Sequence, residues 1–181
     1  MNVSISHLIG TVALMSLFIT AGLSYAIITS YIESDVYKQQ LQQISENVAL
    51  NLVEMMNLIK FAKYSSGYMI KAIDLPSDLG GRAYVVQLVN DTSQWGHVHA
   101  FLSTQKGLSA NSTIPFNLTA ETEIQLFTNA TVQHIQAGID NTTIACSGTV
   151  YGGNEIVIWA QPIWNDENYS ITIGIGWIQA T

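Results

Sequence analysis

The pattern of apolar and polar positions divides the chain into three stretches, and the first is a long uncharged run. From Val3 to Ile32 there is no Asp, Glu, Lys or Arg, and most side chains are apolar. A membrane span needs about 20 apolar residues in a helix. A soluble helix without charge over this length would have to be covered on all sides. The pattern therefore predicts that residues 1–32 form a helix that crosses a membrane.

The length and charge of this run distinguish a membrane helix from a secretory signal, and its apolar side chains indicate which residues make contacts. Secretory signals begin with basic residues and have an apolar core of about 7–15 residues. This run has no basic residue and is longer, although Ala21-Gly22 and Ser24-Tyr25-Ala26 leave cleavage as an alternative. The residues expected to contact lipid or neighbouring helices are Leu8, Ile9, Val12, Leu14, Leu17, Phe18, Ile19, Leu23, Ile27 and Ile28.

The second stretch, residues 33–66, predicts an amphipathic continuation of the same helix. Its apolar positions recur three or four residues apart, which places them in one stripe along a helix. The stripe consists of Leu41, Ile44, Val48, Leu52, Met55, Ile59 and Ala62. A second apolar face, formed by Leu50, Val53, Met56, Leu58 and Phe61, indicates that residues 50–63 lie against the head. Ser65-Ser66-Gly67 predicts the end of the helix.

The third stretch, residues 67–181, changes to short runs rich in β-branched and aromatic residues, separated by turn signals. Strands are expected at 68–73, 83–89, 96–103, 142–150, 155–161 and 169–177, and residues 118–139 fit either a helix or two short strands. Gly152-Gly153-Asn154 predicts a hairpin between Thr149–Tyr151 and Glu155–Trp159. The expected fold class is α+β: a long N-terminal helix, half membrane-apolar and half amphipathic, that carries a small antiparallel β-sandwich-like head.

Composition argues against several functions. The net charge is −7, and none of the six basic residues lies beyond Gly107, so we expect no nucleic-acid binding. We find no Gly-rich phosphate loop, zinc-protease motif or nucleophile elbow, and we expect no enzyme activity and no cofactor. A soft-metal or redox site built from His97, His99, His134 and Cys146 is a third hypothesis, weighed against histidines on a polar strand face and a buried thiol.

Six Asn-x-Ser/Thr triplets mark the third stretch. The 110 residues from Ala72 to the C-terminus contain eight Asn and 19 Ser or Thr. By chance about 8 × 19/110, or 1.4, such triplets would be expected there. The excess predicts N-glycosylation, with the head outside the cell and the N-terminus inside. The alternative is that Asn and Thr serve turn chemistry. The predicted sites are Asn90, Asn111, Asn117, Asn129, Asn141 and Asn168.

An apolar-then-amphipathic helix followed by a β head resembles the type IV pilin-like proteins. The Asn-x-Ser/Thr triplets (sequons) and the single Cys point to the archaeal branch, which includes adhesive pilins, archaellins and archaellum accessory proteins. The segment Ile73–Leu88 looks like the Leu-Pro…Gly…Tyr region that leads into the head strands of such proteins, and Tyr169–Trp177 resembles a last core strand.

The resemblance implies a non-enzymatic subunit of an extracellular filament, with identical subunits as partners through the N-terminal helix and the glycosylated heads displayed outside. Membrane lipid would be the partner before or instead of assembly, and the head would contact an S-layer or another surface. Pilin precursors carry Lys or Arg before their cleavage point, whereas the first basic residue here is Lys38. The alternative is therefore a permanently membrane-anchored accessory protein whose head binds another envelope component.

Overall fold

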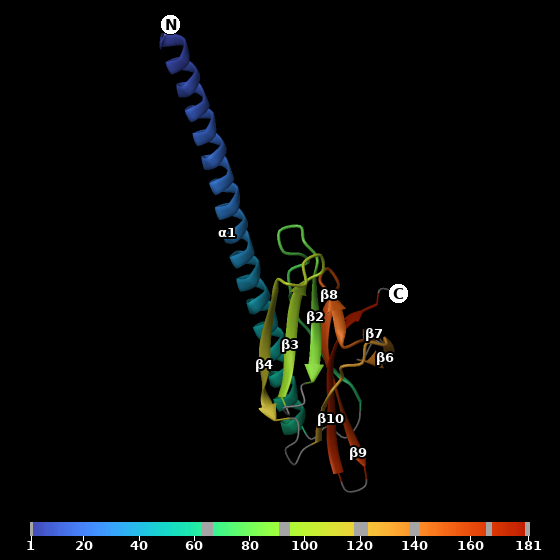
Figure 1. The fold of residues 1–181 in the computed structure, drawn as a ribbon. Helices are drawn as coiled ribbons and strands as arrows, with labels where there is room; N and C mark the ends of the chain where they lie inside the picture. Colours follow the sequence, from blue (N-terminus) through green and yellow to red (C-terminus); the bar gives the residue numbers. More distant parts are fainter. Residues whose placement is uncertain are drawn as a thin grey trace. The chain divides into compact units, whose positions relative to one another are not determined.

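The computed structural model describes residues 2–62, 67–90, 95–117, 123–137, 142–165 and 168–179. This part of the chain combines one long helix with ten strands in two sheets, which confirms the predicted α+β class (Figure 1). The chain divides into two compact units, Met1–Tyr37 and Lys38–Thr181, and each is described by itself.

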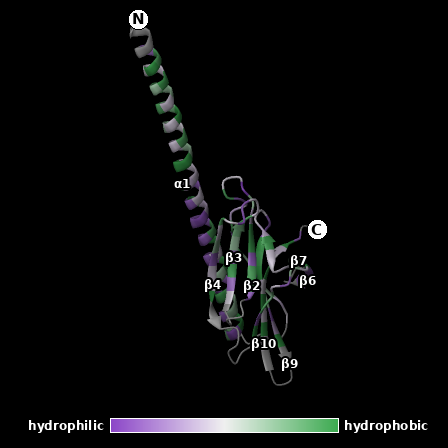
Figure 2. Ribbon diagram, in the orientation of Figure 1, coloured by the Kyte–Doolittle hydropathy of each residue, from purple (hydrophilic) through white to green (hydrophobic). Residues whose placement is uncertain are grey.

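Helix α1 runs from Asn2 to Ala62. In the first unit its residues are mainly hydrophobic, and polar residues become frequent after the apolar run ends (Figure 2). The hydroxyls of Thr11, Thr20 and Thr29 each donate to the carbonyl oxygen four residues earlier, at 2.7–2.9 Å. These bonds satisfy the hydroxyls within the helix, so the threonines need no water.

In the second unit, the predicted stripe on α1 is buried. The stripe residues between Leu41 and Ile59 are each no more than 4% exposed, and Met56 beside them is also buried. Ala62 belongs to the helix, but its side chain lies outside the described part. This stripe packs the helix against the two sheets, and burying one such side chain stabilises the fold by about 1.5–3 kcal/mol.

The predicted second apolar face of α1 is mostly wrong. Leu50 is 65% exposed, Leu58 48% and Phe61 88%, so only part of residues 50–63 lies against the head. A helix lying on a sheet buries one side; Leu58 lies on the flank, and Leu50 and Phe61, about three turns apart, are on the opposite side. Glu54 lies on that side too and forms an ion pair with Lys71 at 2.6 Å. Residues 63–66, the predicted end of the helix, lie outside the described residues.

The strands form two sheets whose neighbours are mostly antiparallel. One has β9 and β10 at its centre, with β1 beside β9 and β7 then β6 beyond β10; β5 pairs with β10 as well. The other has the order β4-β3-β2-β8. The pair β5–β10 is parallel, which departs from the antiparallel expectation. The strands are β1 Met69–Ala72, β2 Tyr84–Asn90, β3 Trp95–Leu102, β4 Ser109–Asn117, β5 Glu123–Leu126, β6 Gln133–Ala137, β7 Thr142–Cys146, β8 Thr149–Tyr151, β9 Ile156–Asn165 and β10 Asn168–Ile178.

The predicted hairpin between β8 and β9 is wrong. Strand β8 pairs with β2 in the four-stranded sheet, whereas β9 pairs with β1 and β10 in the other sheet. Gly152 makes the change of sheet possible, because a Cβ there would lie 2.5 Å from the Tyr84 ring, and its N–H donates to the Tyr84 carbonyl at 2.9 Å. Gly153 follows with φ +94°, a conformation that L side chains rarely adopt. Gly152-Gly153-Asn154 does form a turn, but this turn connects a strand of one sheet to a strand of the other.

Other segments differ from the expected strands in detail. The single strand expected at 142–150 is two strands, β7 and β8, in different sheets. The ambiguous region forms the short strands β5 and β6, although residues 118–122 and 138–141 lie outside the described part. Strand β4 was not predicted. It is an edge strand with Pro115 near its end, the position where a sheet tolerates proline.

The six-stranded sheet is apolar on both faces. Ile158 and Ile173 belong to one face, and the other carries a cluster around Trp159, with Cys146, Val157 and Ile144. Gly174 pairs with Trp159 and leaves room for its ring, whose Nε1 donates to the carbonyl of Ile175 at 3.1 Å. The predicted last core strand is therefore β10, which lies between β9 on one side and β5 and β7 on the other.

Candidate functional surfaces

The first candidate surface is the apolar part of α1 in the first unit. Its large apolar side chains from Leu8 to Ile32 are 56–73% exposed, including all ten predicted contact residues. The helix is long and apolar enough to cross a membrane, and a signal sequence passes the same test. Soluble monomers rarely expose contiguous apolar surface of this extent. This exposure suggests that the surface packs against a partner or a membrane.

The predicted glycosylation sites fall into two groups. Asn90, Asn111 and Asn129 have exposed side chains, as an attached glycan requires. The backbones of Asn117 and Asn168 lie at strand ends, but their side chains, and all of Asn141, are outside the described part. At Asn129 the side-chain oxygen accepts the Thr131 N–H at 3.0 Å. This turn is the Asn chemistry weighed as an alternative, and it coexists with an exposed amide.

The second candidate surface is the outer face of the four-stranded sheet, made of alternate residues on β2, β3 and β4. In the sheet the strands lie side by side, and their partners form cross-strand rows (Figure 1). The even-numbered positions of β2 and β3, from Tyr84 to Leu88 and from Val98 to Leu102, are buried and form the inner face. The outer rows are Val85–Phe101–Ser109, Gln87–His99–Asn111 and Val89–His97–Thr113, of which Val85 is itself buried.

A shallow groove of about 450 Å³ lies on this outer face, lined by Val89, His97, His99, Asn111 and Thr113. The Thr113 hydroxyl is 3.3 Å from Nδ1 of His97. The ring of His99 contacts that of Phe101, with centroids 5.0 Å apart and planes tilted by 37°. The groove therefore combines amide, hydroxyl and imidazole groups, with Phe101 next to it against His99, and none of its lining residues is acidic, Lys or Arg.

Sequence reasoning placed His97 and His99 on one strand face but missed their neighbours on β4. The signal that could have found them is the triplet Asn111-Ser112-Thr113. If this triplet lies in a strand, Asn111 and Thr113 are two residues apart and therefore point to the same face. Pro115 and the polar composition of the segment concealed the strand.

The proposed soft-metal set is not brought together. Cys146 is buried in the six-stranded sheet, among apolar side chains, while His97 and His99 lie on the outer face of the other sheet. His134 is an exposed residue of β6. Burial raises the pKa of the Cys146 thiol to about 12, which disfavours the thiolate that metals and oxidants require. Within the described residues, no group of three His, Cys, Asp or Glu could hold a metal ion.

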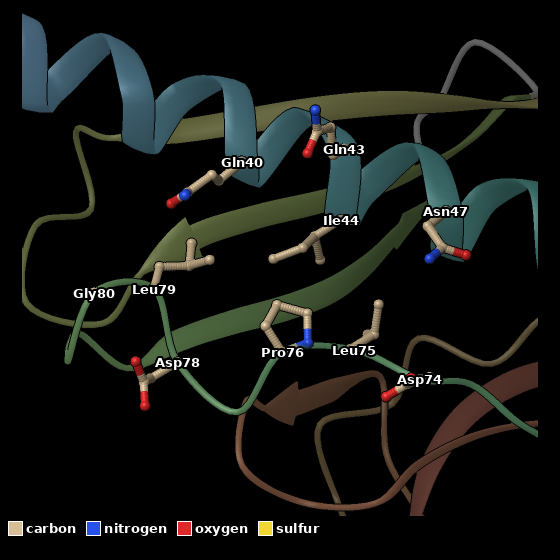
Figure 3. A pocket seen from close by; sticks show the side chains of 10 residues that line it. All are labelled: Gln40, Gln43, Ile44, Asn47, Asp74, Leu75, Pro76, Asp78, Leu79 and Gly80. Carbon is tan, nitrogen blue, oxygen red and sulfur yellow. The ribbon is translucent and has the colours of Figure 1, made fainter.

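A second groove, of about 340 Å³, lies between α1 and the loop 74–80 within the second unit (Figure 3). Gln40, Gln43 and Asn47 line its helical side, and Ile44 and Pro76 lie near one another across it. The carboxylate of Asp78 accepts the N–H of Gly81 at 2.7 Å and thereby closes the turn. The loop helps to hold the core as well, because the Tyr84 hydroxyl donates to the carbonyl of Pro76. These contacts explain the loop as part of the head's packing.

The described geometry thus presents two candidate surfaces: the apolar helix and the outer face of the four-stranded sheet. A long apolar N-terminal helix followed by antiparallel sheets is a pilin-like architecture. Comparison with protein-family models, with curated proteins and with solved structures found no match to this chain.

Proposed function

We propose that this protein is a structural subunit of a pilin-type extracellular filament, with the N-terminal helix in the filament core and a glycosylated β head outside. One observation carries the proposal: an uncharged helix with exposed apolar side chains precedes a head that has its own core. The head needs nothing from the first unit to bury its apolar residues. The first unit is therefore available for contacts outside the chain.

The free energy of covering the exposed apolar side chains of the helix favours assembly or membrane insertion over a free monomer in water. Fourteen large apolar side chains between Leu8 and Ile32 are more than half exposed. Covering each would contribute about 1 kcal/mol or more, so the total is on the order of 20 kcal/mol. A free chain in water would lose this contribution, which exceeds the stability of an ordinary domain. Lipid and neighbouring helices of other copies can both supply the cover.

A permanently anchored accessory protein is the second candidate. The observation in its favour is the lack of a basic residue ahead of Lys38, where the resemblance to pilins implies a processing signal. In this case the helix would remain in lipid, and the head would bind another envelope component.

The first experiment separates the two by location and by the mature N-terminus. Filament assembly predicts that the protein sediments from cell-free medium without detergent. It also predicts that mass spectrometry of the pelleted filaments finds an N-terminal residue beyond Asn2. Recovery of the protein only from detergent extracts, as a monomer that retains Met1 or Asn2, would refute the filament proposal and support the anchor.

A second experiment tests what covers the helix. Gly10, Ser16 and Gly22 are six residues apart, so they point to three sides of the helix about 120° from one another. A Cβ at Gly10 or Gly22 meets nothing within 4 Å in the free chain, and Gly→Leu favours the helix by about 0.8 kcal/mol. Lipid would accommodate leucine at all three positions, but closely packed helices would not.

We therefore expect at least one of Gly10→Leu, Ser16→Leu and Gly22→Leu to abolish sedimentable filaments while leaving the membrane-bound amount unchanged. Val132→Leu, at an exposed position of the head, is the matched control and should assemble normally. Normal filaments from all three variants would contradict a tightly packed helical core.

A further inference from the structure

The geometry points to the groove on the outer face of the four-stranded sheet as a carbohydrate-binding surface, occupied by the first sugars of a glycan attached to Asn111 of the same chain. The inference rests on the proposed glycosylation of the head, and it does not require that the protein forms filaments. It assigns an occupant to a groove whose lining residues play no part in the core.

The position of Asn111 is the first argument. Asn111 has an exposed side chain, lies within β4 and lines the groove. It is the direct cross-strand partner of His99, and Gln87 completes the row on β2. Side chains directly opposite one another in adjacent strands have Cβ atoms about 4.5–5.5 Å apart. A sugar joined to the Asn111 amide nitrogen therefore starts beside the imidazole of His99.

The chemistry of the wall is the second argument. A pyranose ring has C–H groups on its faces and hydroxyls around its edge. The His99 and Phe101 rings contact one another and form an aromatic surface, whose negative π face attracts C–H groups. The amide of Gln87 lies in the same row as His99, where it can bond to hydroxyls. The lining contains no acidic residue, Lys or Arg, so the groove suits a neutral polar ligand.

The size and openness of the groove are the third argument. A volume of about 450 Å³ falls within the range of small-molecule sites. The tether to Asn111 raises the effective concentration of the sugar at the groove to about the millimolar range or higher. Weak stacking is then sufficient to keep the sugar in place. Asn129 serves as the natural contrast, because it lies in a turn and lines neither of the two grooves.

The test compares the thermal midpoint of the full-length protein with and without its glycan, in two backgrounds. Wild type and His99→Ala are each purified in detergent from a glycosylating host and from a bacterium that attaches no N-glycan. Peptide mass spectrometry first establishes that Asn111 carries a glycan. We expect the glycan to raise the midpoint of the wild type by about 2–4 °C, and that of His99→Ala by less than half as much.

Sequon variants assign the effect to one glycan. Asn111→Gln should remove the His99-dependent part of the shift, whereas Asn129→Gln, the matched control, should leave it unchanged. Nuclear magnetic resonance gives a readout that a purely structural role of His99 would not move: protons of the sugar attached to Asn111 should be shifted upfield by the ring in wild type, and not in His99→Ala.

Two results would overturn the inference. One is an unmodified Asn111 in protein from its native host. The other is a glycan-dependent shift that is the same with and without His99, together with sugar protons at their free positions. Neither result bears on sedimentable filaments, so the inference can fail while the proposed function stands.

Discussion

The substitution Leu52→Ala tests whether the second half of α1 is part of the head's core. Leu52 is fully buried, at 0% exposure, whereas Leu50 on the same helix is 65% exposed. Replacing a buried Leu by Ala removes apolar contacts and leaves a cavity, at a cost of about 2–5 kcal/mol. In a unit of this size each kcal/mol lowers the thermal midpoint by about 3 °C. Leu52→Ala should therefore lower the midpoint by about 6–15 °C.

Leu50→Ala is the matched control, because it makes the same chemical change in the same helix without creating a cavity. We expect it to alter the free energy of unfolding by less than about 0.5 kcal/mol. All four Trp lie beyond residue 94, so their fluorescence in detergent-purified full-length protein reports unfolding of the head alone. Equal destabilisation by the two variants, or none by Leu52→Ala, would refute the assignment of the buried stripe to the head's core.

Two further predictions concern the six-stranded sheet and alkaline pH. Gly174→Ala should cost about 1–3 kcal/mol, because its Cβ would lie 2.7 Å from the Trp159 ring, whereas Gly107→Ala, with nothing within 4 Å, should be neutral in urea unfolding. Burial raises the pKa of Cys146 from 9.0 and that of Tyr84 from 10.0, each to about 12. The unfolded chain ionises first, so stability should be fully present below pH 9 and fall as the pH rises towards 12. Urea midpoints that stay constant over this range would contradict the prediction, and Cys146→Ala should lessen the decline that begins near pH 9.

The sequence predicted those features that depend on local periodicity. The recurrence of apolar residues every three or four positions from Leu41 to Ile59 is confirmed by burial, since only one face of a helix can meet the sheets. The same logic failed for Leu50, Leu58 and Phe61. Hydropathy alone does not say which apolar residues on a broad helical face find cover, because that depends on the width of the surface beneath.

Sheet partners could not be read from local signals. Gly152-Gly153-Asn154 reverses the chain, but the same residues serve a hairpin or a crossing between sheets. The outcome depends on a distant contact with Tyr84 and on β9, which pairs on both sides in the other sheet. Strand β4 was missed for a related reason, since its polar outer positions and its proline suit an edge strand and also suit a loop. The groove was missed with it, because His99 and Asn111 meet only once β3 and β4 are paired.

The two sheets of the head differ in what their faces carry, and this difference determines which positions of the head can change. In the described residues, the face of the six-stranded sheet that carries the cluster around Trp159 is filled, and a change in volume there disturbs packing. The outer face of the four-stranded sheet carries imidazole, amide and hydroxyl groups in regular rows above an already filled core. Substitutions at the positions of these rows other than the buried Val85 change what the head presents to its surroundings, while the inner faces and the buried stripe of α1 remain the same. The head can therefore acquire new surface contacts on β2, β3 and β4 without losing its attachment to the helix.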